Sequence, residues 1–199
     1  MSAETLFMRL SDIARIMGGY TFRGKADDPN KLSGLKVIQT RDIREKGYDP
    51  AKVSFSIVDK VGSEFFLLPN DILLPLRGDR IESMVFDGGE GDKYITTNQV
   101  AMMRVFRELL DPYYLAWYLN SSEGRTRIAA KKSGTTIKNI SLKELSGLMV
   151  PIPSFSVQEK IVKLYRNWKS REAILQEMLD VGAVVADEAC MELIRKNAQ

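Results

Sequence analysis

The last 43 residues restrict the fold of this chain more than any other segment. From Val157 onward there is no proline and a single glycine, Gly182. Apolar residues recur at three- and four-residue steps with charged residues between them, which is typical of an amphipathic helix. We therefore predict one long helix, or two helices separated near Gly182. The repeating apolar positions are Ile161, Leu164, Trp168, Leu175, Met178, Val185, Ala189 and Leu193.

A single helix of this length would extend about 60 Å. Such an apolar stripe is longer than a small domain needs to cover its own core, so we expect it to pack against a partner. The alternative is that the helix folds back on the rest of the chain. Cys190, the one cysteine, lies at helical spacing from apolar neighbours and is predicted to be a small core residue rather than a reactive thiol. The positions predicted to contact the partner are Ile161, Leu164, Trp168, Leu175, Met178 and Val185.

Residues 1–155 have a different pattern, which predicts a β-rich domain. Short apolar runs of strand type are separated by Gly, Pro, Asn and Asp. These runs are LKVIQT, KVSFSIV, FFLL, DILLPL, SMVF and QVAMMRVF, and a last strand is predicted in LMVPIP. The fold class is therefore α+β, with a β-rich domain containing small helices over residues 1–155. The coiled-coil-like helix occupies residues 156–199.

Two of the small helices are predicted from their capping residues. LSDIARIMGG has Ser11 as a candidate N-cap and Gly18 or Gly19 as a candidate stop. SLKELSG begins with Ser141 and has Glu144 three residues later, which is the pattern of a capping box.

The tetrapeptide Asp111-Pro112-Tyr113-Tyr114 differs by one residue from Asp-Pro-Pro-Tyr, with which amino-methyltransferases of DNA hold their target nitrogen. A methylase also needs a glycine-rich turn after a strand for S-adenosylmethionine. The nearest candidate, FDGGEGD at 86–92, is acidic and is not followed by a helical pattern. Asp is a preferred N-cap and Pro a preferred first helical residue. We therefore interpret Asp111 as the cap of a helix through PYYLAWYLNSSEGRTRIAAK, residues 112–131.

The composition excludes most catalytic chemistry. The chain has no histidine and one cysteine, so it lacks Ser/His and Cys/His pairs and the usual zinc ligand sets. No glycine-rich loop with Lys-Ser/Thr is present, and no acid stands two residues before a lysine, as in many metal-dependent nucleases. We expect no catalytic residue and no metal site. The chain has no apolar run of about 18 residues and no secretory signal pattern, so we expect a cytoplasmic protein without a membrane span.

The net charge of +3 comes from residues 1–155, because residues 156–199 contain seven basic and seven acidic residues. Positive charge is concentrated in GRTRIAAKKSGTTIKNISLK, residues 124–143, which has six lysines and arginines and no acid. Short Ser, Thr and Asn side chains between them could reach phosphate oxygens or base edges. The stretch indicates a nucleic-acid site, although a solvated charged face has the same composition.

The chain resembles the specificity (S) subunit of type I restriction-modification systems over nearly its whole length. The resemblance lies in LSDIARIMGGYTFRG, VIQTRDIREKG, LLPNDILLPLRG, LDPYYLAWYLNSSEGRTRI and SGTTIKNISLKELSGLMVPIPSFSVQEKIV. The most specific part is the ending Val-Pro-Ile-Pro-Ser followed by Gln158 and Ile161, which enters the long helix. Family members commonly have Glu-Gln where this chain has Val157-Gln158, and this departure leaves the helix entry intact.

The resemblance implies a subunit that catalyses nothing and binds no cofactor. It reads double-stranded DNA and positions modification subunits, which methylate adenine with S-adenosylmethionine, and restriction subunits, which use ATP and magnesium. Typical S subunits contain two recognition domains and two antiparallel helices, and this chain has one of each. The resemblance therefore implies a half subunit that forms a homodimer through antiparallel helices and reads two inverted half-sites separated by a fixed gap. The alternative is a fragment of a longer S subunit.

The candidate DNA contacts follow from the basic stretch and from the polar ends of the predicted strands. Lys131 and Lys132 are expected to bind phosphates, and Ser133, Thr135, Thr136 and Lys138 to contact phosphates and bases. Second candidates are Arg23, Lys25, Thr40, Arg41 and Arg77. Each has a local alternative, such as pairing of Arg77 with Asp79 or of Arg41 with Asp42 or Glu45. The acidic residues Asp79, Glu82, Asp87, Glu90 and Asp92 are expected to face away from DNA, and Tyr20 and Phe22 either to stack on a base or to be buried.

Two other function classes stay open at this stage. A regulatory protein would bind a modification or specificity subunit through its helix without reading DNA. An enzyme would show turnover of nucleotide or methyl donor, for which the sequence offers no residues.

Overall fold

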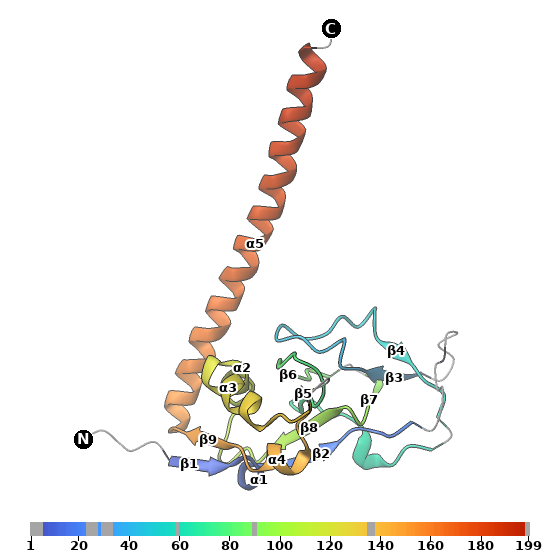
Figure 1. Ribbon diagram of the computed structural model, residues 1–199, viewed down its shortest axis with the longest axis vertical. Helices are drawn as coiled ribbons and strands as arrows, with labels where there is room; N and C mark the ends of the chain where they lie inside the picture. The colour runs from blue at the N-terminus through green and yellow to red at the C-terminus, as the bar shows by residue number, and fades with distance from the viewer. Residues whose placement is uncertain are drawn as a thin grey trace, which may run out of the picture. The chain divides into compact units, whose positions relative to one another are not determined.

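The computed structural model describes residues 6–22, 28, 34–58, 60–88, 91–134 and 138–197. The chain forms two compact units, Met1–Glu159 and Lys160–Gln199. The first is an α+β domain with three small sheets, and the second consists of the long C-terminal helix (Figure 1). The predicted fold class is therefore confirmed.

The largest sheet has the strand order β2-β8-β5-β6 and is antiparallel throughout. Its strands are β2 (Ala14–Gly18), β5 (Ile72–Pro75), β6 (Met84–Val85) and β8 (Val100–Val105). All four residues of β5 are buried, which fits the continuous apolar run Ile-Leu-Leu-Pro. Pro75 is accommodated because it pairs with Val100 near the end of the strand.

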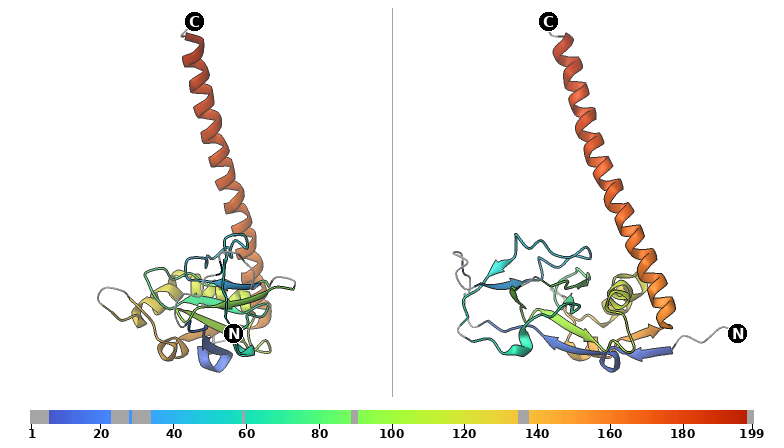
Figure 2. Two further views of the ribbon diagram at one scale, coloured as in Figure 1. Left: turned by 90° about the vertical axis from the view of Figure 1, so that its right-hand side faces the viewer. Right: turned by 180° about the vertical axis from the view of Figure 1, so that it is seen from behind.

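The second sheet has the order β4-β3-β7 and contains β3 (Leu35–Ile38), β4 (Ser54–Phe55) and β7 (Lys93–Thr96). β3 and β7 are parallel, with Leu35 opposite Lys93. A ribbon of β1 (Leu6–Arg9) and β9 (Met149–Ile152) brings the start of the domain beside its end (Figure 2). β9 was predicted from the sequence, whereas β1 and β7 were not.

The core contains residues from the two larger sheets and from the connections between them. Phe86 and Tyr94 pack edge to face at 5.1 Å between ring centroids, and Tyr48 stacks on Phe86 at 5.8 Å. Such pairs stabilise by about 0.5–1.5 kcal/mol beyond the burial of their area. The buried members of this cluster are Ile38, Ile43, Val53, Leu67, Leu73, Met84, Phe86, Tyr94, Val100 and Met102.

Two local predictions were wrong. The first helix, α1, covers only Leu10–Ile13; it has Arg9 as its N-cap, and Ser11 lies inside it. Residues 14–18 form β2, because pairing with β8 along 101–105 outweighs a weak helical pattern. The run FFLL forms no strand; Ser63–Phe65 is a short 3-10 helix, and an extended segment follows.

The helix predicted over residues 112–131 is two helices, α2 (Pro112–Asn120) and α3 (Ser122–Lys131), which lie beside each other (Figure 1). Ser121 is extended and separates them. It ends α2 and caps α3, because its hydroxyl accepts a hydrogen bond from the Gly124 N–H at 3.1 Å. The Asp111 cap was predicted correctly: its carboxylate accepts from the N–H groups of Tyr113 and Tyr114 at 2.7 and 3.2 Å.

The capping box was also predicted correctly. Helix α4 (Leu142–Ser146) begins after Ser141, whose hydroxyl accepts from the Glu144 N–H at 3.1 Å, while the Glu144 carboxylate accepts from the Ser141 N–H at 2.9 Å. These hydrogen bonds lower the pKa of the Glu144 carboxyl, and nearby Lys131 contributes to the shift.

The C-terminal segment is one continuous helix, α5 (Phe155–Asn197), without a break at Gly182. Leu164, Trp168, Leu175, Met178 and Val185 are exposed, with exposed fractions of 52–74%. The prediction for Cys190 was wrong, because this residue is exposed. Helical spacing alone did not show which face of the helix is covered. Within the described part of the chain, no helix combines the length and apolarity that crossing a membrane requires.

Candidate nucleic-acid interface

The basic stretch that follows α3 is joined to the segment that follows β5. Ser133 and Asn139 exchange two backbone hydrogen bonds of 2.8 Å each, which closes the loop between them. Asn139 also bridges to Arg77, and the Gly78 N–H donates to the Lys138 carbonyl at 3.0 Å. Backbone segments that carry positive residues far apart in sequence therefore lie side by side. We call this set the loop surface: Arg77, Gly78, Lys132, Ser133, Lys138 and Asn139.

Lys132 connects the two segments of the loop surface. Its ammonium donates to the Gly78 carbonyl at 2.5 Å, across 54 residues of sequence. Partial burial lowers the pKa of Lys132, while Asp79 acts to raise it and Lys138 to lower it. Since an ammonium has three N–H donors, two of those on Lys132 remain for other acceptors.

The segment 78–83 runs beside α3. Gly78 is bonded to Lys132, the residue after α3, while Ser83 is bonded to Asn120, two residues before α3 begins. Between these ends, the Glu82 carboxylate accepts from the Glu45 N–H at 3.4 Å, and Glu45 pairs with Arg125 of α3 at 3.8 Å. The segment is therefore fixed at both ends of α3.

The hydrogen bonds that hold segment 78–83 to Asn120 are buried. The Ser83 N–H donates to the Asn120 side-chain oxygen at 2.7 Å, and the Asn120 amide donates to the Ser83 carbonyl at 2.8 Å. The Ser83 hydroxyl also donates to the Ala116 carbonyl at 3.2 Å. Because Ser83 has an exposed fraction of 0%, these polar groups have no contact with water.

Replacing Asn120 by alanine is expected to lower the free energy of unfolding by about 2–4 kcal/mol, since two buried backbone groups of Ser83 lose their partner. It should also weaken any binding by the loop surface, because segment 78–83 is then held at one end only. Urea unfolding followed by circular dichroism measures the first effect. The matched control is Asn167→Ala on the exposed side of α5. Equal stability of Asn120→Ala and Asn167→Ala would show that the hydrogen bonds between Ser83 and Asn120 do not stabilise the fold.

The remaining predicted contacts are distributed over other places. Lys131 ends α3 and lies near Glu144, whose carboxyl pKa it influences. Thr40 and Arg41 follow β3, where the Arg41 guanidinium donates to the Ser54 hydroxyl at 2.7 Å and lies 3.7 Å from Asp42. The structure thus brings Arg77, Lys132, Ser133 and Lys138 together but does not join Thr40 and Arg41 to them. Arg23, Lys25, Thr135 and Thr136 lie outside the described residues.

Arg77 and Lys138 are the freest cations of the loop surface. Both are exposed, and neither forms an ion pair with any described residue, including the expected partner of Arg77, Asp79. Asp79 lies close enough to Lys132 to act to raise its pKa. Tyr20 and Phe22 are half-buried and pack edge to face on each other, with ring centroids 5.1 Å apart.

Three further arginines near α3 were not among the residues predicted from the sequence to contact DNA. Arg125 pairs with Glu45, Arg80 lies 3.9 Å from Glu82, and the Arg44 guanidinium donates to the Arg41 carbonyl at 2.6 Å. Arg125 stands inside the basic stretch and Arg80 follows the motif Leu-Arg-Gly-Asp, so composition offered a weak signal for both. For Arg44 there was none, because it lies outside the basic stretch and, among the described residues, its guanidinium bonds only to the nearby carbonyls of Arg41 and Ile43.

Gln158 explains why the sequence entering the long helix is so specific. Its side-chain oxygen accepts from the Asp111 N–H at 2.9 Å, and its amide donates to the carbonyls of Leu109 and Pro153 at 3.2 and 2.9 Å. Gln158 has an exposed fraction of 1%. One side chain therefore joins the start of α5 to the residues preceding α2.

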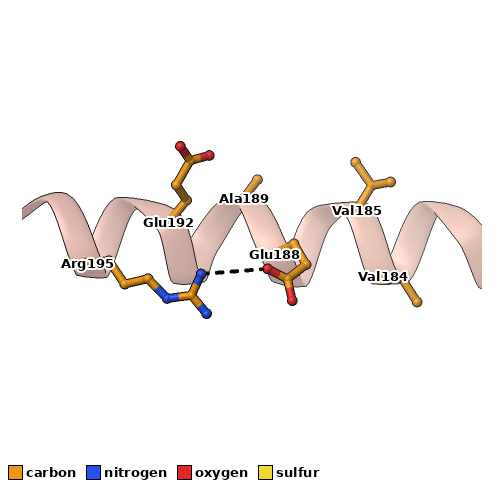
Figure 3. Close-up of a pocket in the computed structure, with 6 residues that line it drawn as sticks. All are labelled: Val184, Val185, Glu188, Ala189, Glu192 and Arg195. Carbon is orange, nitrogen blue, oxygen red and sulfur yellow. Dashed lines mark ion pairs between the residues drawn. The ribbon is translucent and has the colours of Figure 1, made fainter.

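Among the described residues, no group of three or more His, Cys, Asp or Glu side chains is placed to hold a metal ion. A shallow hollow on α5 is lined by Val184, Val185, Glu188, Ala189, Glu192 and Arg195 (Figure 3). All six belong to the same helix, and Arg195 lies 3.9 Å from Glu188. One helix cannot enclose a small molecule, so we interpret the hollow as part of a helix surface.

Comparison with known proteins gives one family and several structures. Residues 4–177 match the family described as type I restriction modification DNA specificity domain. No curated protein is a significant match to the sequence.

Three solved structures have the same fold as most of the chain. The HsdS subunit from Thermoanaerobacter tengcongensis is 18% identical with a TM-score of 0.66, over 89% of this chain and 40% of that one. The type I S subunit from M. genitalium is 15% identical with a TM-score of 0.59, over 94% and 46%. A chain from a type I R-M system, solved to explain complex assembly and conformational transition, is 19% identical with a TM-score of 0.67, over 88% and 40%. The present chain thus spans less than half the length of each.

Proposed function

Because this chain belongs to the family of type I restriction modification DNA specificity domains, we propose that it reads double-stranded DNA and catalyses no reaction itself. The observation that carries this proposal is the loop surface. Backbone hydrogen bonds hold Arg77, Lys132 and Lys138 together there, beside the short polar side chains of Ser133 and Asn139. Clustered cations provide affinity for phosphates, and short polar side chains provide contacts to bases.

The proposed contacts differ in role. Arg77 and Lys138 bind phosphates, since both are exposed and form no ion pair with a described residue. Lys132 orders the loop through Gly78 and offers its remaining donors to a phosphate. Ser133 and Asn139 contact bases or sugars, and Thr135 and Thr136, which lie outside the described residues, stay candidates for the same role. Thr40, Arg41, Arg23 and Lys25 remain secondary candidates for the edge of the interface. Lys131, predicted as a phosphate contact, is now placed with them because it ends α3 near Glu144.

We further propose that two copies assemble through α5 and present two identical domains to DNA. A two-fold protein reads two inverted half-sites separated by a fixed gap. The apolar positions proposed for the contact are Ile161, Leu164, Trp168, Leu175, Met178 and Val185, five of which are exposed. If the chain is instead part of a longer S subunit, α5 would pair with another helix of that subunit.

In this proposal the chemistry belongs to partner subunits. A modification subunit would methylate adenine with S-adenosylmethionine, and a restriction subunit, joined through the complex, would use ATP and magnesium. The chain would hold none of these cofactors and would act in the cytoplasm. A regulatory partner that does not read DNA is the alternative, and sequence preference in DNA binding separates the two functions.

The double substitution Arg77→Ala and Lys138→Ala tests the placement of the site. Each lost phosphate contact removes about 0.9 from the slope of log affinity against log salt, so the slope should flatten by about two for each bound chain. Affinity should fall by a similar factor for all sequences, because phosphates carry no sequence information. The measurement is a salt titration of binding to a mixed-sequence DNA duplex, followed by fluorescence anisotropy.

The matched control is Arg15→Ala with Lys60→Ala, which removes the same two residue types from β2 and from the segment before Ser63. Both original residues are exposed. An unchanged slope in the Arg77 and Lys138 variant, or equal flattening in the control, would show that the loop surface is not the DNA site. Selection of duplexes from a random pool then tests function: enrichment of inverted half-sites supports a reader, and the absence of any preference supports the regulatory alternative.

A further inference from the structure

Segment 78–83 leads from the loop surface to a second pair of cations. Arg80 follows Gly78 by two residues, and Arg125 lies on α3, seven residues before Lys132. Seven residues are about two helical turns, or about 10 Å along the axis. One strand of a DNA duplex carries a phosphate about every 3.4 Å of axis, so the row from Lys132 to Arg125 spans about three phosphates. The loop surface thus continues along α3 as a row of basic residues.

Each arginine of this second pair faces a glutamate. Arg125 Nη2 lies 3.8 Å from Glu45 Oε2, and Arg80 Nε lies 3.9 Å from Glu82 Oε1. The glutamates are adjacent to each other, because the Glu45 N–H donates to the Glu82 carboxylate at 3.4 Å. The side chains of Arg125 and Arg80 have exposed fractions of 43% and 46%, whereas those of Glu45 and Glu82 have 19% and 28%. The arginines are therefore the outer groups of this cluster, and the glutamates are the more buried ones.

Neither arginine is fixed in position by the glutamate that it faces. Separations of 3.8 and 3.9 Å are too long for hydrogen bonds. In the same domain, by contrast, the Arg104 guanidinium donates two hydrogen bonds of 2.7 Å to the Asp71 carboxylate. The Nε of Arg125 is buried and has no hydrogen-bond partner among the described residues. A buried donor without an acceptor is costly, so the contacts within the chain do not account for Arg125.

We infer that Arg80 and Arg125 form a second phosphate-binding site of the DNA interface, and that Glu45 and Glu82 limit its affinity as built-in counter-ions. The inference rests on the DNA reading of the proposed function and adds a control on how tightly the domain holds any duplex. A carboxylate about 4 Å from a guanidinium opposes its attraction for a phosphate. Because phosphates carry no sequence information, the glutamates weaken binding to all sequences and speed release from DNA without a target.

The double substitution Glu45→Gln and Glu82→Gln in the full-length chain tests this inference. Glutamine has nearly the same size and keeps a side-chain oxygen at position 82 that can accept from the N–H of residue 45. With both carboxylates gone, the slope of log affinity against log salt should steepen by up to about two. The gain in affinity over wild type should therefore be about ten times larger at about 50 mM than at about 200 mM salt. The measurement is fluorescence anisotropy with a mixed-sequence duplex.

The matched control is Glu64→Gln with Glu108→Gln, which changes the net charge equally at two exposed positions and should leave the slope nearly unchanged. A second comparison places the Glu45 and Glu82 substitutions in a chain that also carries Arg80→Gln and Arg125→Gln. The gain should then disappear, because no arginine is left for the carboxylates to oppose. An equal gain in the control, or a gain that persists without the arginines, would identify a general charge effect and overturn the inference. Urea unfolding verifies that each variant is folded, and Arg80→Gln with Arg125→Gln alone should flatten the slope.

The Arg77 and Lys138 variant separates failure of this inference from failure of the proposed function. A flatter slope in that variant, with an unchanged or flatter slope in the Glu45 and Glu82 variant, overturns the inference and leaves the loop surface as the DNA site. A steeper slope in the Glu45 and Glu82 variant that depends on Arg80 and Arg125 supports the inference, whatever the loop surface contributes. A wild-type chain that binds no duplex even at low salt overturns both.

Discussion

Replacing Gln158 by leucine is expected to lower the free energy of unfolding by about 3–5 kcal/mol, although the two side chains have similar volumes. The substitution leaves the Asp111 N–H and the carbonyls of Leu109 and Pro153 without their partner. Each buried polar group that loses its hydrogen bond costs about 1–3 kcal/mol. Urea unfolding of the full-length chain measures the difference. The matched control is Gln176→Leu, which removes an exposed glutamine from the middle of α5.

Gln158→Glu separates the hydrogen bonds from the shape of the side chain. A carboxylate at this buried position can still accept from Asp111 but faces two carbonyl oxygens, so its pKa in the folded state should be raised above its unfolded value. A raised carboxyl pKa stabilises the fold below the unfolded pKa of about 4.3, and this stability is lost as the pH rises through the folded pKa. The variant should therefore approach the wild-type stability near pH 4 and fall behind it near pH 7. A stability difference from wild type that is the same at both pH values would contradict this account of Gln158.

The parts of this fold that could be predicted from the sequence are those determined by neighbouring residues. The Asp111 cap, the box of Ser141 and Glu144, and the long helix each depend on contacts within a few positions along the chain. The strand at 14–18 was mistaken for a helix because its identity depends on pairing with β8, about 90 residues away. Short-range patterns carry no information about such pairing.

The candidate DNA site, like the fold, could be predicted only where it depends on neighbouring residues. The basic stretch 124–143 was visible as composition, and three of its predicted residues, Lys132, Ser133 and Lys138, belong to the loop surface. The contribution of Arg77 was visible only as a second candidate, since its approach to Lys138 depends on the Asn139 bridge and on Gly78. The carbonyl that orders Lys132 belongs to that same glycine, 54 residues earlier. No spacing rule connects these positions, because a β-bridge between loops leaves no periodic signal.

Gly124→Ala is expected to lower the free energy of unfolding by about 3 kcal/mol or more, against the usual preference of helices for alanine. A Cβ at this position would lie 2.0 Å from the carbonyl oxygen of Tyr118 and 3.0 Å from the Cα of Leu119. These are backbone atoms of α2, so relief requires the turn at Ser121 to open. Overpacking of this kind costs about 1–3 kcal/mol and occasionally more, which outweighs the gain of about 1 kcal/mol in helix propensity.

The control for Gly124→Ala is Gly147→Ala, where the nearest atom to an added Cβ lies 3.7 Å away and φ is −83°. That substitution should be neutral or stabilising by up to about 1 kcal/mol, because alanine restricts the unfolded chain. Thermal and urea unfolding measure the stability of both variants. Equal stability of the two would show that residue 124 does not pack tightly against the backbone of α2. Opening the turn at Ser121 also moves Arg125 and the end of α3, which Lys132 directly follows. Gly124→Ala should therefore weaken DNA binding at temperatures where it is still folded, whereas Gly147→Ala should leave it unchanged.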